Sequence, residues 1–591
     1  MSVEPEVEAA AAALVDTLAA NWAVPGVTVA VTDRDGVLWE RVGGLADLAR
    51  GEPLRADHLL EIGSISKAVT AIVVLQSVRD GLLSLDQSIV SVLPWIPAAL
   101  HDPGITLRRL LNHTAGLVGS VDALPDEAAQ IAGYVPGERG IAPGGRFHYS
   151  NVGFLLLGLA AATVNGRPLA ELVRERVFAP AGMPDAIPVI TAADAERLAT
   201  GHQPRSEDLP ARPGDPLVAA PLVETAGSDG AIAATAADLA AFARVLLRGG
   251  AGDAGEVLDT ASFAAMTGLL APAGEDVLVV PGRPGPTWSR YGLGINVEQG
   301  AHGRVLSHGG GMVGFASFLL ADPAAGRAVV VLTNADGDSP VAEAIARSVA
   351  AVFDGRDRGE APRADVALDP AHWSLPAPEA PGPHGTAGIA GHLSVRPPTL
   401  SAAAVGVFAR ADGCILQIRA SATGYDVVFA GETAPLCWTW SERCVTAVAA
   451  LRRFALVFDG AAWTWGADVF ARQSAETGGA ITAVGPERVD GDPVDVVDPA
   501  LLRSAPGHYR AYTPWYPHLR IVRRGGGLVL IAPRGAEAPA EDQPLVPLGG
   551  GLFRIGADPA APESLRFGPV VDGHNVWLDR DGCRYSRSFT P

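Results

Sequence analysis

A Pro-rich stretch at residues 356–386 divides this 591-residue chain into two halves with different sequence patterns. In the first half, segments with the 3.6-residue apolar spacing of helices are mixed with segments that alternate like strands. In the second half the helical patterns fade and short alternating strands dominate. Because a Pro-rich segment favours an extended backbone, we expect a linker between separately folded units. The length also exceeds what one hydrophobic core supports.

The first half, residues 1–355, predicts an antiparallel sheet flanked by helices. Thr235 and Asp238 resemble a capping box at the start of one helix. Paired strands are predicted for 26–44 and 314–336, and helices for 66–81, 235–250 and 341–353. Since strands stand at both ends with helices between them, we expect one α+β domain.

The second half contains an internal repeat. Residues 391–400 resemble 507–517, and 451–465 resemble 563–578, both at an offset of about 115 residues. Each copy is long enough for a small antiparallel barrel. A single domain of two sheets is the alternative. The repeat favours two β-barrel domains, at 387–490 and 500–591.

Net charge limits the partners that we expect. The formal charge of −20 disfavours a nucleic-acid binder, which needs a basic face. It suits a protein that acts on a small molecule or a peptide. The N-terminus lacks the basic start and apolar run of a signal peptide, and the longest apolar runs are too short to span a bilayer. We expect a cytoplasmic protein without a membrane partner, and a homodimer stays open.

The cysteines and histidines do not form a metal-binding motif. All four cysteines lie in the second half, without metal-type spacing, and are expected to be small core residues. No metal and no cofactor are predicted.

Lys67 is the only lysine among the 45 basic residues, and it follows Ser64 by three positions. At that spacing both side chains lie on the same face of a helix. A serine hydroxyl is a weak nucleophile until a base takes its proton. Arginine cannot be that base, whereas lysine can when its surroundings lower its pKa. The pair therefore predicts an activated serine nucleophile.

Two further motifs strengthen this prediction. Tyr149, Ser150 and Asn151 stand at a loop-to-helix junction. A tyrosine hydroxyl can pass a proton between the nucleophile and the leaving group, and an asparagine amide can hold a substrate amide. The segment from His308 to Gly310 opens an apolar strand, where glycines let a substrate backbone approach closely.

In this order, the three motifs resemble those of the serine β-lactamase and penicillin-binding-protein superfamily. The similarity is greatest to its class C-like branch (peptidase S12 type), which includes esterases, D-aminopeptidases and penicillin-binding-type thioesterases. The resemblance covers about residues 10–355 and includes ITLRRLLNHTAGL (105–117), in which His113 belongs to a structural turn, and YGLGINV (291–297). It implies a β-lactamase-like antiparallel sheet flanked by helices. The second half resembles the lipocalin-like domains that follow the catalytic domain of D-aminopeptidase.

The resemblance also implies roles. Ser64 is the nucleophile, Lys67 its base, and Tyr149 a second general acid and base. Backbone N–H groups of Ser64 and Gly311 form an oxyanion hole. The implied substrate-binding residues are Asn151, His308, Gly309 and Gly310.

His308 and Gly309 replace the usual Lys-Thr pair of the third motif. They provide a weaker cation and no hydroxyl, which argues against efficient β-lactam hydrolysis. In D-aminopeptidase a barrel loop carries an acidic residue that recognises the substrate's amine. The corresponding candidates here lie in the loop 533–545, at Glu537, Glu541 and Asp542, although a solvated hairpin turn is the simpler interpretation.

Several functions remain open from the sequence. The leading one is a serine hydrolase that acts through an acyl-Ser64 intermediate on a small amide or ester, as D-aminopeptidases and amidases do. The alternatives are a carboxylesterase, a penicillin-binding-type thioesterase or peptide cyclase with a carrier-protein partner, and a noncatalytic binding protein on the same fold. The intact trio of Ser64, Lys67 and Tyr149 disfavours the last.

Overall fold

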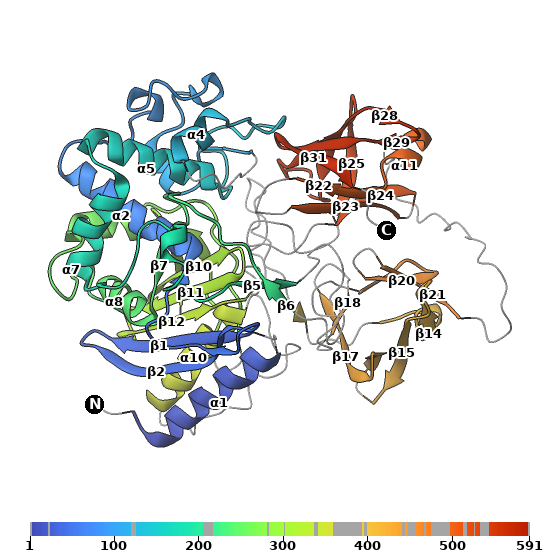
Figure 1. Cartoon of the computed structure of the whole chain (residues 1–591), viewed down its shortest axis with the longest axis horizontal. Helices are drawn as coiled ribbons and strands as arrows, with labels where there is room; N and C mark the ends of the chain where they lie inside the picture. The colour runs from blue at the N-terminus through green and yellow to red at the C-terminus, as the bar shows by residue number, and fades with distance from the viewer. Residues whose placement is uncertain are drawn as a thin grey trace.

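The computed structural model describes most of the first half and the strands of the second half (Figure 1). The described residues are 3–21, 24–119, 126–204, 217–280, 283–300, 302–335, 341–357, 393–394, 399–422, 424–439, 444–446, 456–465, 468–473, 497–511, 517–524, 526–531 and 543–588.

An eight-stranded antiparallel sheet forms the centre of the first half, with strand order β3-β2-β1-β12-β11-β10-β9-β8. Its middle strands β1, β11 and β12 are apolar and buried along nearly their whole length, because helices cover both faces, and β1 and β12 are rich in β-branched residues. The strands are β1 (Gly26–Asp33), β2 (Val37–Asp47), β3 (Glu52–Pro53), β8 (Ser289–Tyr291), β9 (Asn296–Gln299), β10 (Arg304–Met312), β11 (Phe315–Asp322) and β12 (Arg327–Thr333).

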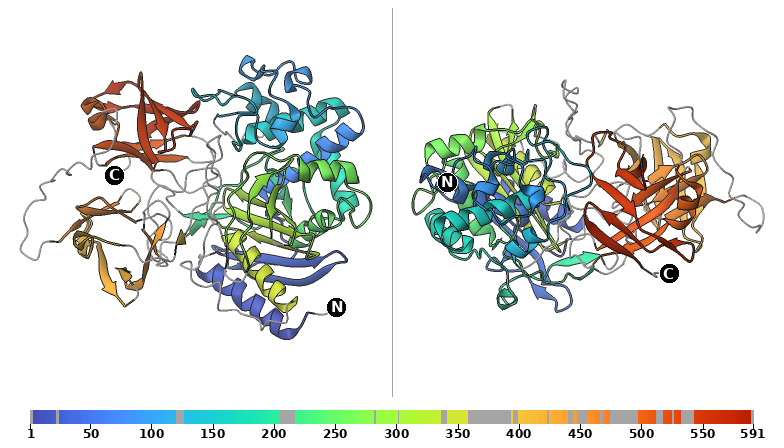
Figure 2. Two further views of the ribbon diagram at one scale, coloured as in Figure 1. Left: turned by 180° about the vertical axis from the view of Figure 1, so that it is seen from behind. Right: turned by 90° about the horizontal axis from the view of Figure 1, so that it is seen from above.

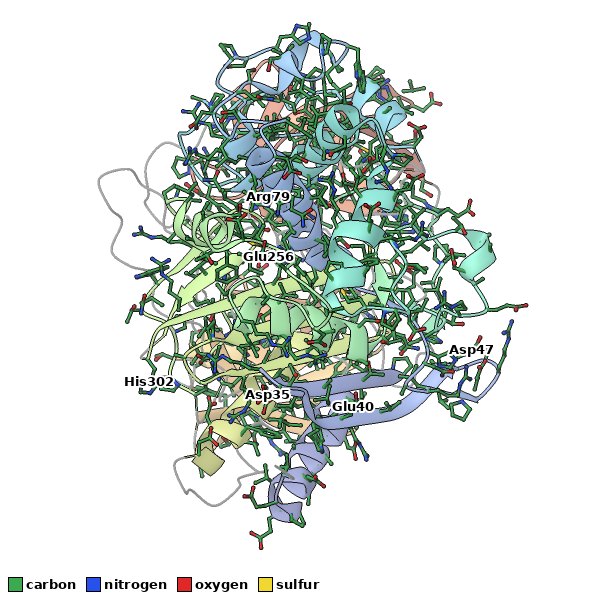
Figure 3. All side chains as sticks on the ribbon, turned by 90° about the vertical axis from the view of Figure 1, so that its left-hand side faces the viewer. Asp35, Glu40, Asp47, Arg79, Glu256 and His302 are labelled. Carbon is green, nitrogen blue, oxygen red and sulfur yellow. The ribbon has the colours of Figure 1, made fainter. Side chains whose placement is uncertain are left out.

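Helices cover the sheet on both sides, and an apolar core fills each interface. On one face lie α1 (Pro5–Asn21) and α10 (Val341–Asp357), at the bottom of Figure 1. On the other lie α2 (Ser66–Arg79), α5 (Asn151–Asn165) and α8 (Ala236–Leu247). Charged side chains such as Asp35, Glu40 and Arg79 point outward from this domain (Figure 3).

Local sequence explains the ends of these helices. Thr235 and Asp238 exchange hydrogen bonds in the predicted capping box before α8. Gly166 ends α5 in the left-handed conformation, with φ of +63°. Nearly every residue of α2 is buried, so this helix lies inside the domain and brings its N-terminal end to the middle of the sheet.

Shorter elements complete the first half. They are the helices α3 (Leu107–Leu111), α4 (Glu127–Ala132), α6 (Leu169–Val173), α7 (Ala179–Ala181) and α9 (Thr260–Gly268), and the strands β4 (Leu60–Glu61), β5 (His202–Pro204), β6 (Leu217–Ala219) and β7 (Ala233–Ala234).

The first C-terminal unit is an eight-stranded up-and-down sheet that closes on itself. Each strand pairs with the next, and the first strand, β14, pairs with the last, β21. Its strands are β14 (Gly406–Ala409), β15 (Ile415–Ser421), β16 (Gly424–Phe429), β17 (Glu432–Thr439), β18 (Cys444–Thr446), β19 (Leu456–Phe458), β20 (Ala462–Trp465) and β21 (Asp468–Arg472). A short additional strand, β13 (Leu393–Ser394), pairs with β17 outside this ring.

The second C-terminal unit is a closed barrel with the same order of eight strands. A helix, α11 (Pro499–Ser504), precedes it, and a small hairpin of β28 (Val570–Val571) and β29 (His574–Asn575) interrupts it. Its strands are β22 (Gly507–Arg510), β23 (His518–Arg524), β24 (Gly527–Ile531), β25 (Gln543–Gly549), β26 (Leu552–Ile555), β27 (Ser564–Phe567), β30 (Trp577–Arg580) and β31 (Cys583–Ser588).

The two units lie side by side on one flank of the first domain (Figures 1 and 2). Ile531 of β24 packs into the apolar core of the first unit, so they share an interface. The prediction of two barrels is confirmed, and the alternative of one two-sheet domain is excluded. One repeat correspondence is displaced, because 391–400 contains β13 whereas β14 holds the place of β22 in the ring.

Two predicted segments lie largely outside the described residues. Helix α10 continues to Asp357, so the first residues of the expected linker are helical, and 358–386 is not described. Glu537, Glu541 and Asp542 also lie outside the described residues, whereas the end of their loop forms the start of β25.

The described residues provide little support for a membrane span or a metal site. No single helix among them is long and apolar enough to cross a membrane. Helix α5 and the following segment Leu169–Ala181 are long and apolar enough only when taken together, and the chain bends by 83° between them. In the same residues, no three His, Cys, Asp or Glu side chains gather as a metal site would require. Cys444 is buried, and Cys414 and Cys583 are partly buried.

Candidate active site

The predicted nucleophile, Ser64, comes directly after Gly63, where the backbone lies very close to that of Gly311. Gly63 opens a 3₁₀ turn (Gly63–Ile65) that runs directly into α2, and its φ is +49°. A Cβ atom on Gly63 would lie 2.7 Å from the backbone nitrogen of Gly311 on β10 and 2.6 Å from its oxygen. Only glycine fits there, because both the left-handed backbone and the contact exclude a side chain. This contact places Ser64 beside the Gly311 amide.

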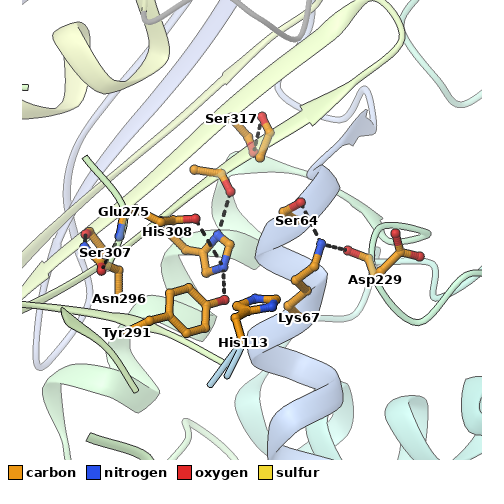
Figure 4. Close-up of polar contacts among 12 residues, drawn as sticks. Ser64, Lys67, His113, Asp229, Glu275, Tyr291, Asn296, Ser307, His308 and Ser317 are labelled. Carbon is orange, nitrogen blue, oxygen red and sulfur yellow. Dashed lines mark hydrogen bonds and ion pairs between the residues drawn. The ribbon is translucent and has the colours of Figure 1, made fainter. Parts of the chain in front are cut away.

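Lys67 lies one helical turn after Ser64 and points toward it (Figure 4). Its amine donates a hydrogen bond to Ser64 Oγ at 2.9 Å and another to the backbone oxygen of Asp229 at 3.0 Å. The side chain is fully buried, and its Nζ lies 4.9 Å from the centre of the Tyr149 ring. The structure therefore brings together all three predicted catalytic side chains.

The position of Tyr149 depends on His113, which the sequence indicated only as part of a turn. The two rings stack with their centres 4.2 Å apart. On either side of Tyr149, the backbone N–H of His148 donates to His113 O at 2.8 Å, and that of Ser150 donates to His113 Nδ1 at 3.0 Å. Burial lowers the pKa of His113 well below its usual value, so the ring is neutral. His113 thus holds Tyr149 through two hydrogen bonds and a stacked ring.

Asn151 begins α5, directly after the capping residue Ser150. Its Oδ1 atom is buried and has no hydrogen-bond partner in the described part of the chain. A buried amide oxygen without a partner is costly, which makes it available to an incoming N–H group.

His308 lies on β10, and its imidazole is fully buried. Its Nδ1 atom lies 2.6 Å from Gly309 O, and its Nε2 atom lies 2.6 Å from the Tyr291 hydroxyl. A carbonyl oxygen can only accept, so Nδ1 carries the proton and Nε2 accepts a hydrogen bond from Tyr291. Burial lowers the pKa of His308 to about 3.

These contacts correct one expectation from the sequence. The motif predicts that His308 supplies a cation in place of the usual lysine, but burial keeps it neutral near pH 7. The third motif therefore contributes an uncharged, hydrogen-bonded Tyr291–His308 pair.

Close packing fixes the neighbouring glycines of β10. A Cβ atom on Gly310 would overlap Ile62 O, so the strand contacts the residue before Gly63. The Ser317 hydroxyl, from β11, donates to the same Ile62 oxygen at 2.8 Å. On Gly309 a Cβ atom would meet only the Phe318 ring, at 3.7 Å.

Two carboxyl groups at the site gave no signal in the sequence. Glu275 lies with its Oε1 atom 4.0 Å from His308 Nε2, and Asp229 lies beside Lys67 (Figure 4). Burial raises the pKa of Glu275 to about 8 and also raises that of Asp229, although Lys67 opposes both shifts. Both residues come from irregular segments, where no periodicity marks a side chain that faces the site. Tyr291, by contrast, begins the YGLGINV stretch noted above.

Comparison with known proteins identifies the family to which the first half of the chain is similar. Residues 11–353, more than half of the chain, match the Beta-lactamase family. Penicillin-binding protein 4 of Amycolatopsis lactamdurans is 29% identical over 333 residues, which cover 54% of this chain and 83% of that protein. Esterase EstB of Burkholderia gladioli is 32% identical over 225 residues, or 34% of this chain and 55% of that protein. A D-aminopeptidase of Cereibacter sphaeroides is 27% identical over 315 residues, or 49% of this chain and 53% of that protein.

The chain therefore belongs to the Beta-lactamase family. It is a hydrolase of the β-lactamase and penicillin-binding-protein type, as the predicted resemblance implied. The match ends near the end of α10, so it does not include the two barrels. The matched region spans about half the length of the esterase and of the D-aminopeptidase.

Proposed function

We propose that this protein is a serine hydrolase that forms an acyl-Ser64 intermediate with a small amide or ester carrying a free amine. The observation that carries the proposal is the 2.9 Å hydrogen bond between the buried Lys67 amine and Ser64 Oγ. It places a proton acceptor of the required kind within reach of the nucleophile.

Acylation would use the three motifs together. Ser64 Oγ attacks the substrate carbonyl carbon while the neutral Lys67 amine takes its proton. The backbone N–H groups of Ser64 and Gly311 stabilise the negative charge that develops on the carbonyl oxygen. As the carbon–nitrogen or carbon–oxygen bond breaks, the Tyr149 hydroxyl gives its proton to the leaving group and recovers one from Lys67.

Deacylation would follow the same path with water. A water molecule attacks the acyl-Ser64 carbonyl carbon and gives one proton to Lys67 through Tyr149. Ser64 Oγ leaves and takes that proton back. The product acid is released, and the enzyme returns to its starting state.

The charges around the site favour an amine on the substrate. Glu275 lies beside His308, and the neutral His308 cannot attract a carboxylate. A substrate ammonium group would lower the pKa of the Glu275 carboxyl group and pair with its ionised form. This supports an aminoacyl substrate of the kind that D-aminopeptidases cleave, and it disfavours β-lactams, which carry a carboxylate.

Ester hydrolysis is the second candidate. The similarity to Esterase EstB supports it, and the uncharged Tyr291–His308 pair provides no charge that would disfavour a neutral substrate. The same acyl-Ser64 chemistry serves both candidates, so only the substrate decides between them.

The test compares turnover of D- and L-alanine p-nitroanilide, their N-acetylated forms, and p-nitrophenyl butyrate. We expect turnover of the D-anilide with a free amine, and complete loss of it in Ser64→Ala. Lys67→Arg has a permanent charge and cannot accept the proton, and it should lower kcat by about a hundredfold or more. Intact-mass analysis after rapid quenching should detect acyl-Ser64.

Each of the other outcomes has a defined meaning. Ser64-dependent cleavage of the ester alone would select the esterase. Equal activity of Ser64→Ala and the parent protein on every substrate would contradict the proposal.

A further inference from the structure

The segment that leads into Tyr149, residues 134–148, is in contact with the second C-terminal barrel. Glu138 accepts two hydrogen bonds from the guanidinium of Arg566 on β27, at 2.7 and 2.5 Å. The two residues are more than 400 positions apart in the sequence. This paired geometry fixes both distance and orientation, because both carboxylate oxygens are engaged.

Two arginines of segment 134–148 form hydrogen bonds with the loop that precedes β27. Arg139 donates to the backbone oxygens of Ala561 and Pro559, the latter at 3.4 Å. Arg146 donates to the backbone oxygen of Ala560. Charged donors thus hold both the middle of the segment and its end near Tyr149.

The turn between β30 and β31 fits against the start of the same segment. Gly582 has φ of +87°, and a Cβ atom there would lie 2.8 Å from the Val135 backbone oxygen. The Asp581 carboxylate accepts hydrogen bonds from the amide and hydroxyl of Ser564, and it would lie 3.0 Å from a Cβ atom on Gly137. The barrel turn at Gly582 and the segment at Gly137 therefore pack so closely that neither position has room for a side chain.

The final contact lies next to the proposed catalytic tyrosine. His148 Nδ1 lies 3.8 Å from the Glu563 carboxylate of the barrel. The backbone of His148 is bound in turn to His113, whose ring stacks on Tyr149. A continuous set of contacts therefore runs from the barrel through His148 and His113 to Tyr149.

We propose that the second C-terminal barrel holds Tyr149 in its working position through segment 134–148. Glu138 and Arg566 are positioning residues, because they act on Tyr149 through the backbone between them. The proposal rests on the acyl-Ser64 chemistry described above. It assigns to the barrel a part in the hydrolase reaction that the family match, which ends before it, does not contain.

The size of the loss in kcat, compared with the loss in folding stability, distinguishes positioning of Tyr149 from simple stabilisation of the fold. An exposed ion pair contributes at most about 1 kcal/mol to folding stability. Proton transfer through Tyr149 depends on its distance from Ser64 and the leaving group, and a shift of about 1 Å can cost up to a hundredfold in rate. Loss of the pair should therefore lower kcat much more than it lowers thermal stability.

The experiment reverses the charges of this pair in the full-length protein. Glu138→Arg and Arg566→Glu, each alone, should lower kcat for a Ser64-dependent substrate about tenfold, with KM changed less than about twofold. The double variant restores the pair with opposite polarity and should recover most of the lost kcat. Hydrogen exchange at the amides of His148 and Ser150 should be faster in the single variants.

A matched control is available at the opposite end of the domain. Arg41 and Asp16 form the same two-bond pair with nearly the same exposure, 37% and 51% against 37% and 47% for Arg566 and Glu138. Asp16→Arg should leave kcat and the exchange of both amides unchanged. Arg566→Gln is a milder variant that serves if charge reversal prevents folding.

The outcomes distinguish this inference from the proposed function. Turnover in Glu138→Arg equal to that in Asp16→Arg, or a loss that the double variant does not recover, would overturn the inference alone. Absence of Ser64-dependent turnover in the parent protein would reject the proposed function. In that case amide exchange decides, and unchanged exchange in Glu138→Arg would reject the positioning role.

Discussion

Glu275 lies beside the Tyr291–His308 pair, and the proposed function assigns it the recognition of a substrate amine. Its side chain is 26% exposed, and its Oε1 atom lies 4.0 Å from the neutral His308 imidazole. Near pH 7 most of it is protonated, because burial raises its pKa to about 8. A substrate ammonium group would ionise it on binding, and this response is specific to a cation.

Glu275→Gln tests this role because it keeps the shape of the side chain and removes the charge. We expect kcat/KM for D-alanine p-nitroanilide to fall about tenfold or more, the cost of one charged hydrogen bond. Turnover of p-nitrophenyl butyrate, which has no amine, should stay within about twofold of the parent value. Steady-state kinetics on both substrates provide the measurement.

The next residue provides a control. Asp276→Asn removes a carboxyl group from the same segment at an exposed position, and both activities should be retained. Equal losses on the amine and the ester in Glu275→Gln would show that the residue supports the fold and does not recognise a charge.

Helix α10 is joined to the edge of the sheet behind the site by a buried ion-pair network. Arg347 donates to both carboxylate oxygens of Glu298 on β9, at 2.7 and 3.0 Å, and to Glu343 at 2.6 Å. Burial would raise the pKa of Glu298, but the charge and hydrogen bonds of Arg347 outweigh it and lower that pKa. Ser307, the neighbour of His308, donates to Glu298 as well. The network therefore fixes the strand that carries His308.

Removal of Arg347 should destabilise the catalytic domain strongly. Arg347→Met fills similar space but leaves Glu298 charged and unpaired in the core, and breaking a buried pair of this kind costs about 3–5 kcal/mol. We expect a clear drop in the unfolding temperature by calorimetry. Arg41→Gln, which breaks an exposed pair, should change it far less. An equal, small change in both variants would show that the network contributes little.

The pH dependence of stability combines buried acids whose pKa values are raised with buried histidines whose pKa values are lowered. Glu127 and Glu275 have pKa values raised by burial to about 7 and about 8, so the folded state holds their protons longer than the unfolded state. Their contribution falls as pH rises above about 4.5. Burial also lowers the pKa values of His113 and His308, and their contribution falls as pH drops below about 6.5.

Between about pH 4.5 and 6.5 the two effects oppose each other, and Glu61, whose pKa burial raises to about 8, adds to the effect of the two glutamates. The unfolding temperature should fall between pH 6.5 and 8 as Glu275 loses its proton, and Glu275→Gln should reduce that fall. Calorimetry from pH 4 to 9 on both proteins provides the measurement. A parent unfolding temperature that rises steadily from pH 6.5 to 8 would contradict the raised pKa values of the two glutamates.

Local sequence was sufficient for several elements and for the three motifs. Apolar periodicity located the β1–β2 and β11–β12 pairs and helices α2, α8 and α10, because each buries one continuous set of side chains. The Ser64–Lys67 spacing predicted their contact, since three residues in a helix return to the same face. The repeat predicted two barrels, which share one strand order, although their exact alignment needed the pairing of β14 with β21.

The remaining features depend on contacts between segments far apart in the chain. The neutral state of His308 follows from its burial beside Tyr291, and spacing along the chain carries no measure of burial. Asp229 and Glu275 reach the site from irregular segments that no periodic pattern marks. The barrel meets the segment before Tyr149 through residues more than 400 positions away, as Glu138 and Arg566 show. Such contacts form only when the whole chain is packed. The motifs therefore predicted the candidate catalytic residues, whereas the packing determined the charge of His308 and the contacts that hold the segment before Tyr149.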